Sequence, residues 1–310
     1  LSNLSVSSFC EDDLGFIWVG TARGIARFDG NSFEHFFFND KDTNSLYNDF
    51  ITSLTVKDKE LFIGTNNGLN KYDIEKEKMQ RVGSNKTSYA SLTVWGNVLY
   101  GAPVFSGLEY YDPKKNTMIH LGKIPREILI NQLIADKDNG IWCLPVNQNF
   151  LFLYNPGLNK LTKYDLSFEQ NKPGSKRLNC GKIIGNNLWI GSNNGIQIFN
   201  IDGRRFLSIN ELPDKLRVLL NIEITSIEIN RGVVWIGTKT DGIFIFDINF
   251  NQIQHYNKDE INSISSSFIR TIFADRNNNV WVGTFDAGID VSFEQRKNFK
   301  SEKVLNNYID

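Results

Sequence analysis

Among 310 residues, 34 basic and 35 acidic side chains give a formal charge of −1, so nothing in the charge favours a nucleic acid or an anionic membrane as partner. A composition with 41% hydrophobic residues excludes a disordered chain, and no apolar stretch approaches the roughly 18 residues of a membrane-spanning helix. Three distant cysteines exclude a disulfide framework and a short-spaced zinc motif, and the length leaves either two ordinary domains or one closed β architecture.

One phrase recurs along the chain: an apolar pair, Gly, Thr or Ser, two or three polar residues, Gly, and an alternating strand that ends in Asp or Asn. In chain order its copies lie at 17–29, 61–73, 98–112, 141–155, 188–200, 234–247 and 280–291. The third copy is weak, and the fourth lacks both glycines. We take the second apolar residue of each copy as its anchor: Trp18, Phe62, Leu99, Trp142, Trp189, Trp235 and Trp281. These anchors include five of the six tryptophans and lie 37 to 47 residues apart.

A period in the forties with four strand-like segments per repeat is typical of a propeller blade. In the second repeat these segments are 49–57, 60–65, 68–73 and 78–82, and we name such segments strands A to D. The sequence therefore predicts an all-β fold, a single seven-bladed β-propeller of four-stranded antiparallel blades. The expected blades are approximately 1–40, 41–84, 85–123, 124–167, 168–210, 211–258 and 259–310. Together they account for the chain, so the two-domain option fails.

Glycines and leucines add local expectations. In the phrase G-[TS]-x-x-G, the second Gly is expected to supply a positive φ for the B–C turn, and the first to let strand B pack closely on its neighbour. The anchors should fill the space between adjacent blades. Three stretches exceed the repeat, at 38–48, 167–177 and 209–221. The last carries leucines at helical spacing, and we expect a turn or two of helix that covers a blade edge rather than a partner-binding helix.

The strands of a blade alternate in direction, so the B–C turns and the D–A connections emerge on one face of the ring. Propellers usually act through loops around the channel mouth. Amides, charges and rings on this face suit a sugar, because amides bind hydroxyls and rings stack on sugar faces. However, the 37 asparagines are expected at tight turns for backbone reasons alone. The candidate ligand-binding residues are Arg23, Tyr47, Phe105, Gln148, Lys239, Asp241, Phe285 and Asp286. The D–A connections add Asn48, Tyr89, Asn131, Gln132, Arg177 and Phe268 to the same face.

An enzyme is the weaker interpretation. His35, His120 and His255 lie in or beside predicted D strands, so a histidine-based metal site or general base is not expected. Residues 13–18 match part of a sialidase Asp box, but Glu11 stands where Ser or Thr is needed. We interpret the aspartates at 13, 138 and 275 as formers of A–B turns. A carboxylate pair drawn from the aspartates at 49, 241 and 286 stays open. The sequence predicts no catalytic residue, cofactor or metal.

The repeated phrase, W-[IV]-G-T-x-x-G-[LI]-x-x-[YF]-D, is preceded by segments such as SFCEDDLGFIW and TIFADRNNNVW, and before them by NSLYNDF or NSISSSF. In this form it resembles the two-component regulator propeller repeat, and the resemblance covers all seven copies. Copies three and four depart from it, with GAPVFSG and LPVNQN, either by drift or because their loops are reshaped for a ligand.

The resemblance implies a fragment of a longer receptor, the non-catalytic periplasmic sensor propeller of a glycan-responsive hybrid histidine kinase. It implies recognition of a ligand derived from an oligosaccharide or polysaccharide, a homodimer through the full-length receptor, and signal transfer to the kinase. It implies no nucleic acid and no membrane contact by this part. Two alternatives stay open, a pure scaffold whose ligand binds elsewhere in the receptor, and a propeller lyase or glycoside hydrolase. Strand A of the first blade starts near Leu4 and strand D of the last near 298–303, so each blade is expected to be complete in itself.

Overall fold

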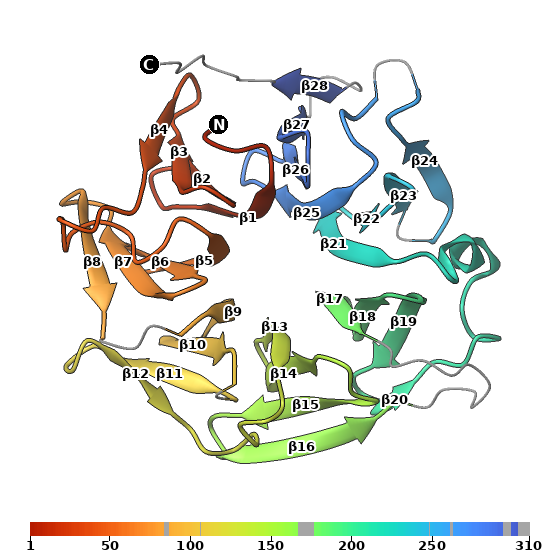
Figure 1. Cartoon of the computed structure of the whole chain (residues 1–310). Helices are drawn as coiled ribbons and strands as arrows, with labels where there is room; N and C mark the ends of the chain where they lie inside the picture. Colours follow the sequence, from red (N-terminus) through yellow and green to blue (C-terminus); the bar gives the residue numbers. More distant parts are fainter. Residues whose placement is uncertain are drawn as a thin grey trace.

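Seven four-stranded antiparallel sheets follow one another around a ring in the computed structural model, which confirms the predicted propeller (Figure 1). The structure describes residues 1–83, 87–105, 107–166, 177–247, 249–260, 263–293 and 299–302. In every sheet the strand order in space equals the order in sequence. The A strands line the centre of the ring and contact one another from blade to blade, including the first and the last.

The strands are short, as the repeat predicts. The first blade consists of β1 (Val6–Glu11), β2 (Ile17–Thr21), β3 (Ile25–Phe28) and β4 (Phe33–Phe36), and the second of β5 (Ile51–Lys57), β6 (Glu60–Thr65), β7 (Gly68–Asp73) and β8 (Lys78–Val82). The third blade consists of β9 (Tyr89–Trp95), β10 (Val98–Pro103), β11 (Glu109–Asp112) and β12 (Thr117–His120), the fourth of β13 (Ile130–Asp136), β14 (Gly140–Pro145), β15 (Phe150–Asn155) and β16 (Lys160–Asp165), and the fifth of β17 (Leu178–Ile184), β18 (Asn187–Ser192), β19 (Gly195–Asn200) and β20 (Arg205–Phe206). The sixth blade consists of β21 (Ile224–Asn230), β22 (Val233–Thr238), β23 (Ile243–Asp247) and β24 (Gln252–Tyr256), and the seventh of β25 (Ile269–Ala274), β26 (Val280–Thr284), β27 (Ile289–Ser292) and β28 (Phe299–Glu302).

The anchors fill the space between blades, as expected. Six of them are buried, and Trp235 is partly buried. The Trp18 ring meets Tyr72 of the second blade edge-on at 5.1 Å, and Trp142 meets Phe199 of the fifth blade at 5.2 Å. Such edge-to-face pairs add about 0.5–1.5 kcal/mol to the burial of their area.

The two glycines of the repeated phrase act as predicted. Gly24 has a φ of 85°, which closes the first B–C turn. A Cβ on Gly20 would lie 2.6 Å from the Ile51 side chain, so β2 can approach the next blade only because this residue has no side chain. Between the glycines, Thr21 Oγ1 donates to the Gly24 carbonyl at 2.8 Å and accepts the Arg23 N–H at 3.0 Å.

Aspartates organise three of the A–B turns. Asp12 accepts the Trp18 indole N–H at 2.7 Å, and its second oxygen accepts two backbone N–H groups of the turn at 3.0 Å. Asp136 and Asp275 bind the indole N–H of their own anchors in the same way, at 2.9 and 2.8 Å. Asp275 was expected at its turn. In the first and fourth blades, however, the carboxylates that organise the turn are Asp12 and Asp136 rather than the expected Asp13 and Asp138.

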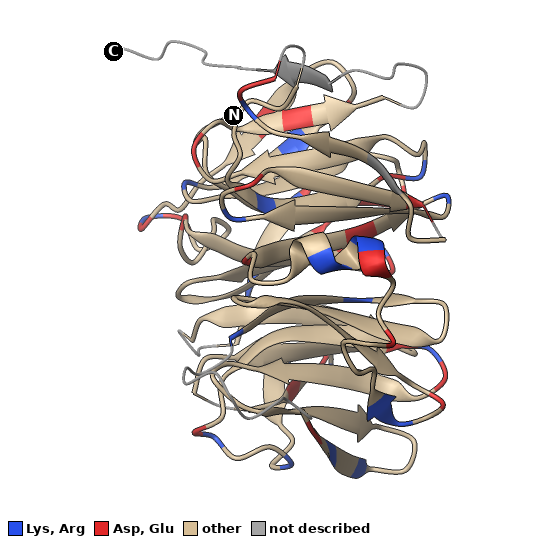
Figure 2. Cartoon of the chain, turned by 90° about the vertical axis from the view of Figure 1, so that its right-hand side faces the viewer, with Lys and Arg blue, Asp and Glu red and all other residues tan. Residues whose placement is uncertain are grey.

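The leucine-rich stretch forms a short 3₁₀ helix, η1 (Asp214–Leu219), on the rim of the ring (Figures 1 and 2). Leu212, Leu216 and Leu219 are buried in one cluster with apolar residues of the fifth and sixth blades, which confirms a helical cover on a blade edge. Positions of lysine or arginine and of aspartate or glutamate are scattered over this side of the ring (Figure 2). Of the other long stretches, residues 167–176 lie outside the described part.

Each blade is a contiguous piece of chain, as predicted, so the ring closes by contact between the first and last blades. The Gly288 N–H donates to the Leu4 carbonyl at 2.9 Å, and Arg276 N–H donates to the Glu11 carboxylate at 2.7 Å. Phe9 packs on Trp281 at a ring distance of 6.3 Å. Within the described residues, no helix is long and apolar enough to cross a membrane.

Candidate ligand-binding face

One backbone hydrogen bond recurs at the channel entrance in every blade. The residue after the Gly-Thr or Gly-Ser position donates its N–H to the carbonyl of the residue that precedes strand A. Because strand A is innermost, these two residues stand at the mouth of the channel, and we call them mouth pairs. In blade order they are Ser5 and Ala22, Phe50 and Asn66, Ser88 and Val104, Leu129 and Val146, Arg177 and Asn193, Glu223 and Lys239, and Phe268 and Phe285.

The mouth pairs divide the entrance into sectors of different chemistry. The third and fourth blades contribute small or apolar side chains, and the fifth and sixth contribute mainly charged ones. The seventh contributes two phenylalanines, and the first contributes only Ser5 and Ala22. The entrance therefore offers an apolar sector in the third and fourth blades, a charged sector in the fifth and sixth, and an aromatic sector next to it in the seventh.

Two cations share a single carboxylate in the charged sector. Glu223 accepts Arg177 Nη2 at 2.5 Å and Lys239 Nζ at 2.9 Å, while Arg177 Nε donates to Asn179 Oδ1 at 2.9 Å. Burial alone would raise the pKa of Glu223, but the hydrogen bonds and charges of Lys239 and Arg177 outweigh it and lower that pKa. The sector keeps one net positive charge, and Lys239 would have to share or leave its carboxylate to contact a ligand.

The aromatic sector is more open. The Phe268 and Phe285 rings are stacked at 4.7 Å with planes 14° apart, and Phe285 is 47% exposed. The Arg270 guanidinium lies 5.8 Å from the Phe285 ring and 5.9 Å from the Phe50 ring of the second blade. These rings can stack on an apolar face of a ligand.

A belt of side chains runs just inside the mouth. The pairing of strands A and B slips near the start of every A strand, and the residue at the slip is in turn Ser7, Thr52, Ala90, Asn131, Asn179, Thr225 and Arg270. Several of these donate to the first carbonyl of the next blade's A strand. Thr52 Oγ1 donates to Tyr89 O at 2.5 Å, and Thr225 Oγ1 donates to Ile269 O at 2.6 Å. The belt residues therefore tie blades together around the channel.

Of the eight candidate ligand-binding residues, the mouth pairs contain Lys239 and Phe285, and of the residues that the D–A connections added to this face they contain Arg177 and Phe268. The B–C turn candidates that lie one or two residues farther along are Arg23, Phe105, Gln148, Asp241 and Asp286. Phe105 is 70% exposed, and Gln148 is half-buried.

The side chain of Tyr47 is held by contacts within the fold. Its hydroxyl donates to the Gly83 carbonyl at 2.6 Å, its ring lies against Gly68, and the Arg81 guanidinium sits 5.0 Å from the ring centre. These contacts hold the D–A connection of the second blade, which is a structural role.

Sequence reasoning did not select Phe50, Glu223 or Arg270. Phe50 and Glu223 directly precede strand A, and Arg270 lies within it. Alignment of the repeats could have identified them. The residue just before strand A and the second residue of that strand line the mouth in every blade.

Features that an enzyme would need are sparse. His35, His120 and His255 lie on the outermost strands β4, β12 and β24, as predicted. The described residues contain no group of three or more His, Cys, Asp or Glu side chains able to hold a metal ion.

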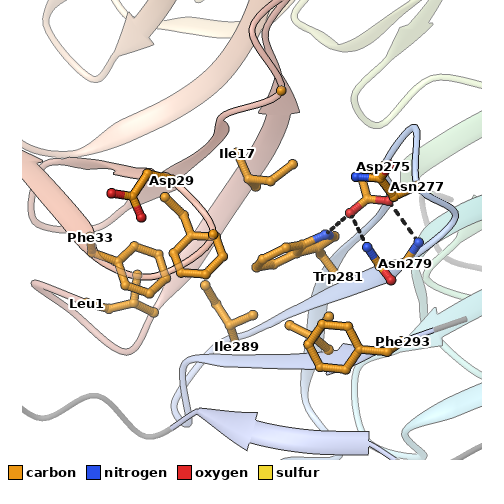
Figure 3. Close-up of a pocket in the computed structure, with 14 residues that line it drawn as sticks. Leu1, Ile17, Asp29, Phe33, Asp275, Asn277, Asn279, Trp281, Ile289 and Phe293 are labelled. Atoms are coloured by element: carbon orange, nitrogen blue, oxygen red, sulfur yellow. Dashed lines mark hydrogen bonds between the residues drawn. The ribbon is translucent and has the colours of Figure 1, made fainter. Parts of the chain in front are cut away.

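A cavity of about 360 Å³ lies at the seam between the last and first blades, on the face opposite the mouth (Figure 3). Its walls include Ile17, Phe33, Trp281 and Ile289. Asp275 also lines it, but its carboxylate is held by Trp281 and Asn279 at 2.8 and 2.9 Å. Asp29 and Asn277 add further polar groups to its walls, and the cavity contains none of the candidate residues.

The family model of the two-component regulator propeller matches residues 1–23 and 263–286, which lie in the first and last blades. Both matched segments are similar to the two-component regulator propeller repeat. This finding confirms the resemblance that the sequence pattern indicates. Over 247 residues the chain is 27% identical to histidine kinase P4 of Formosa agariphila, a match that covers 73% of this chain and 17% of that kinase.

Solved structures share the fold of this chain. An extracellular domain from B. thetaiotaomicron, assigned to a hybrid two-component system, superposes with a TM-score of 0.77 at 24% identity. The match covers 94% of this chain and 40% of that domain. Streptogramin B lyase superposes with a TM-score of 0.68 at 12% identity and covers 92% of both chains. The chain thus spans less than half of the histidine kinase and of the extracellular domain that it matches, and its fold is also found in an enzyme.

Proposed function

We propose that this chain is a non-catalytic, extracytoplasmic sensor propeller of a hybrid two-component signalling protein, located in the periplasm. In this function it recognises a carbohydrate-derived signal and supports dimerisation and signal transfer to a histidine kinase. The observation that carries the proposal is the family match in both terminal blades, together with the likeness to an extracellular domain of a hybrid two-component system. The exposed rings and polar groups at the mouth support carbohydrate recognition.

Isothermal titration calorimetry of the propeller with a panel of neutral and acidic oligosaccharides tests recognition. We expect saturable binding by at least one member, weakened about tenfold by Phe285→Ala because a stacking surface is lost. Lys239→Ala should also weaken it. Leu158→Ala is the matched control, since Leu158 is a 74% exposed apolar side chain at a C–D turn on the opposite face. Equal binding by all variants would place the ligand away from the mouth.

The scaffold alternative predicts no binding to this chain by any saccharide on the panel. In that case the same panel should bind only to the full-length receptor, and its mouth variants should retain wild-type affinity. This result would reject recognition by the propeller while leaving its place in a signalling protein intact.

The enzyme alternative draws on the fold shared with streptogramin B lyase. We expect no lyase or hydrolase turnover of polysaccharides by the isolated protein. Turnover abolished by Asp241→Ala or Asp286→Ala would overturn the non-catalytic proposal.

Dimerisation is tested by sedimentation of the full-length receptor with and without the propeller. A dimer that is unchanged when the propeller is removed would contradict the proposed role of the propeller in dimerisation.

A further inference from the structure

Arg270 differs from every other residue of the belt inside the channel mouth. The other belt positions carry Ser, Thr, Asn or Ala, and only Arg270 is charged. Whereas Thr52 and Thr225 donate to backbone carbonyls of the next blade, Arg270 Nη1 donates to the Ser5 hydroxyl at 2.9 Å. Inter-blade bonding therefore needs no cation here, because neutral donors serve the same purpose elsewhere.

Among the described residues, the Arg270 guanidinium has no carboxylate partner. Within the part of the chain that the structure describes, no aspartate or glutamate lies within ion-pair distance of Arg270, and its only hydrogen bond goes to Ser5. Half-buried, it loses part of its hydration, and burial lowers its pKa. A half-buried cation without a counter-charge is costly unless an anion approaches it. Nε and Nη2 together form the fork that binds a carboxylate or sulfate through two parallel hydrogen bonds.

Two aromatic rings flank this cation, Phe285 of the last blade and Phe50 of the second, at 5.8 and 5.9 Å from its centre. Both rings are partly exposed, at 47% and 37%. The first blade lies between them and contributes only Ser5 and Ala22 to the mouth, so Arg270 can reach across it. An anion-binding fork between two stacking surfaces matches a sugar ring that carries an acidic group.

We propose that Arg270, with Phe50 and Phe285, forms a binding site for the anionic group of an acidic saccharide. This inference rests on the proposed function and adds to it the class of ligand and the residue that selects it. The carboxylate of a uronic acid and a sulfate ester share the required chemistry, two anionic oxygens in one plane. A neutral saccharide would leave the guanidinium unpaired and would bind less tightly.

Calorimetry at low salt tests the site with trigalacturonate and, as its neutral twin, fully methyl-esterified trigalacturonate. A sulfated oligosaccharide, a carrageenan tetrasaccharide, forms the third arm. We expect Arg270→Gln to weaken the favoured acidic ligand about 10- to 100-fold, because a charge-assisted fork is lost. The comparison of carboxylate and sulfate arms identifies which anion the site takes. Raising the salt concentration should weaken the acidic ligand only.

Two control variants separate charge from folding. Lys258→Gln removes an exposed cation from the D–A connection before the last blade, on the same face, and should leave affinity unchanged. Ser5→Ala removes the contact with the first blade but keeps the Arg270 charge, so it should retain most of the affinity. Phe50→Ala should weaken all saccharides that bind.

The outcomes are distinguishable. Binding of acidic ligands that Arg270→Gln leaves unchanged, or a neutral twin that binds as tightly as the acid, would overturn the inference and leave the proposed function standing. No binding by any saccharide would contradict carbohydrate recognition itself. Loss of binding in Ser5→Ala as severe as in Arg270→Gln, with a lowered melting temperature, would assign Arg270 a structural role only.

Discussion

Asp12 is a residue on which the stability of the first blade depends strongly. Its carboxylate is fully buried and accepts three hydrogen bonds, from the Trp18 indole N–H at 2.7 Å and from the Leu14 and Phe16 N–H groups at 3.0 Å. Asp12→Ala leaves all three donors without this acceptor. The buried indole accounts for about 1–3 kcal/mol, and the half-buried backbone groups for about 1 kcal/mol each. We expect a total loss of about 3–5 kcal/mol in the free energy of unfolding.

The melting temperature provides the first measurement. For a chain of 310 residues, an unfolding entropy of about 2.1 cal/mol/K per residue converts a loss of 4 kcal/mol into a fall of about 6 °C. Asp13→Ala is the control, because its carboxylate is exposed and takes part only in a 3.4 Å surface pair with Arg276, which contributes little.

A double-mutant cycle with Trp18→Phe then isolates the indole contact. Without the indole N–H, removal of the carboxylate should cost about 1–3 kcal/mol less than in the wild-type protein. A coupling energy below about 0.5 kcal/mol, or an equal effect of the Asp12 and Asp13 variants, would refute this account of the turn.

Three further predictions concern packing, charge and the thiols. Gly20→Ala should cost about 1–3 kcal/mol, because its Cβ would lie 2.6 Å from the next blade, while Gly157→Ala, with no atom nearer than 3.4 Å, should be nearly neutral in urea unfolding. Glu223 has a pKa below its ordinary value of 4.5, so its stabilisation is present above that value and is lost as the pH falls through the folded-state pKa. The stability difference between wild type and Glu223→Gln should therefore shrink in acid unfolding curves, and a pH-independent difference would contradict the ion-pair geometry. Burial raises the pKa of all three cysteine thiols, so Ellman's reagent should react with them only after unfolding, and fast labelling of the native protein would show that they are accessible.

The repeat allowed the fold to be predicted almost completely, because each blade repeats the same local signals. The strands of the second blade, the positive φ of Gly24 and the burial of the anchors all follow from residue types at fixed spacing. The leucine-rich cover was also predictable, since the spacing of its leucines gives it one apolar side.

The candidate site was less predictable, because its contacts join residues from different blades. The sequence singled out Tyr47 as an aromatic side chain without a turn function, but Gly83 and Arg81 engage it in packing. The sequence did not identify Arg270 because this residue lies inside a strand. The shift in strand pairing at Arg270, whose side chain contacts Ser5, cannot be recognised from the order of the residues. Asp12 was passed over for its neighbour for a similar reason, since the sequence does not reveal which of two adjacent carboxylates points inward.

The contiguity of the blades has a topological consequence. Since no sheet takes strands from both ends of the chain, the backbone could be cut at any D–A connection without dividing a sheet. The ring should therefore tolerate a single cut at such a connection. The first and last blades are each complete and are held together by contacts between them. Separating these two blades would expose the walls of the cavity between them and would leave the hydrogen bonds within every sheet intact.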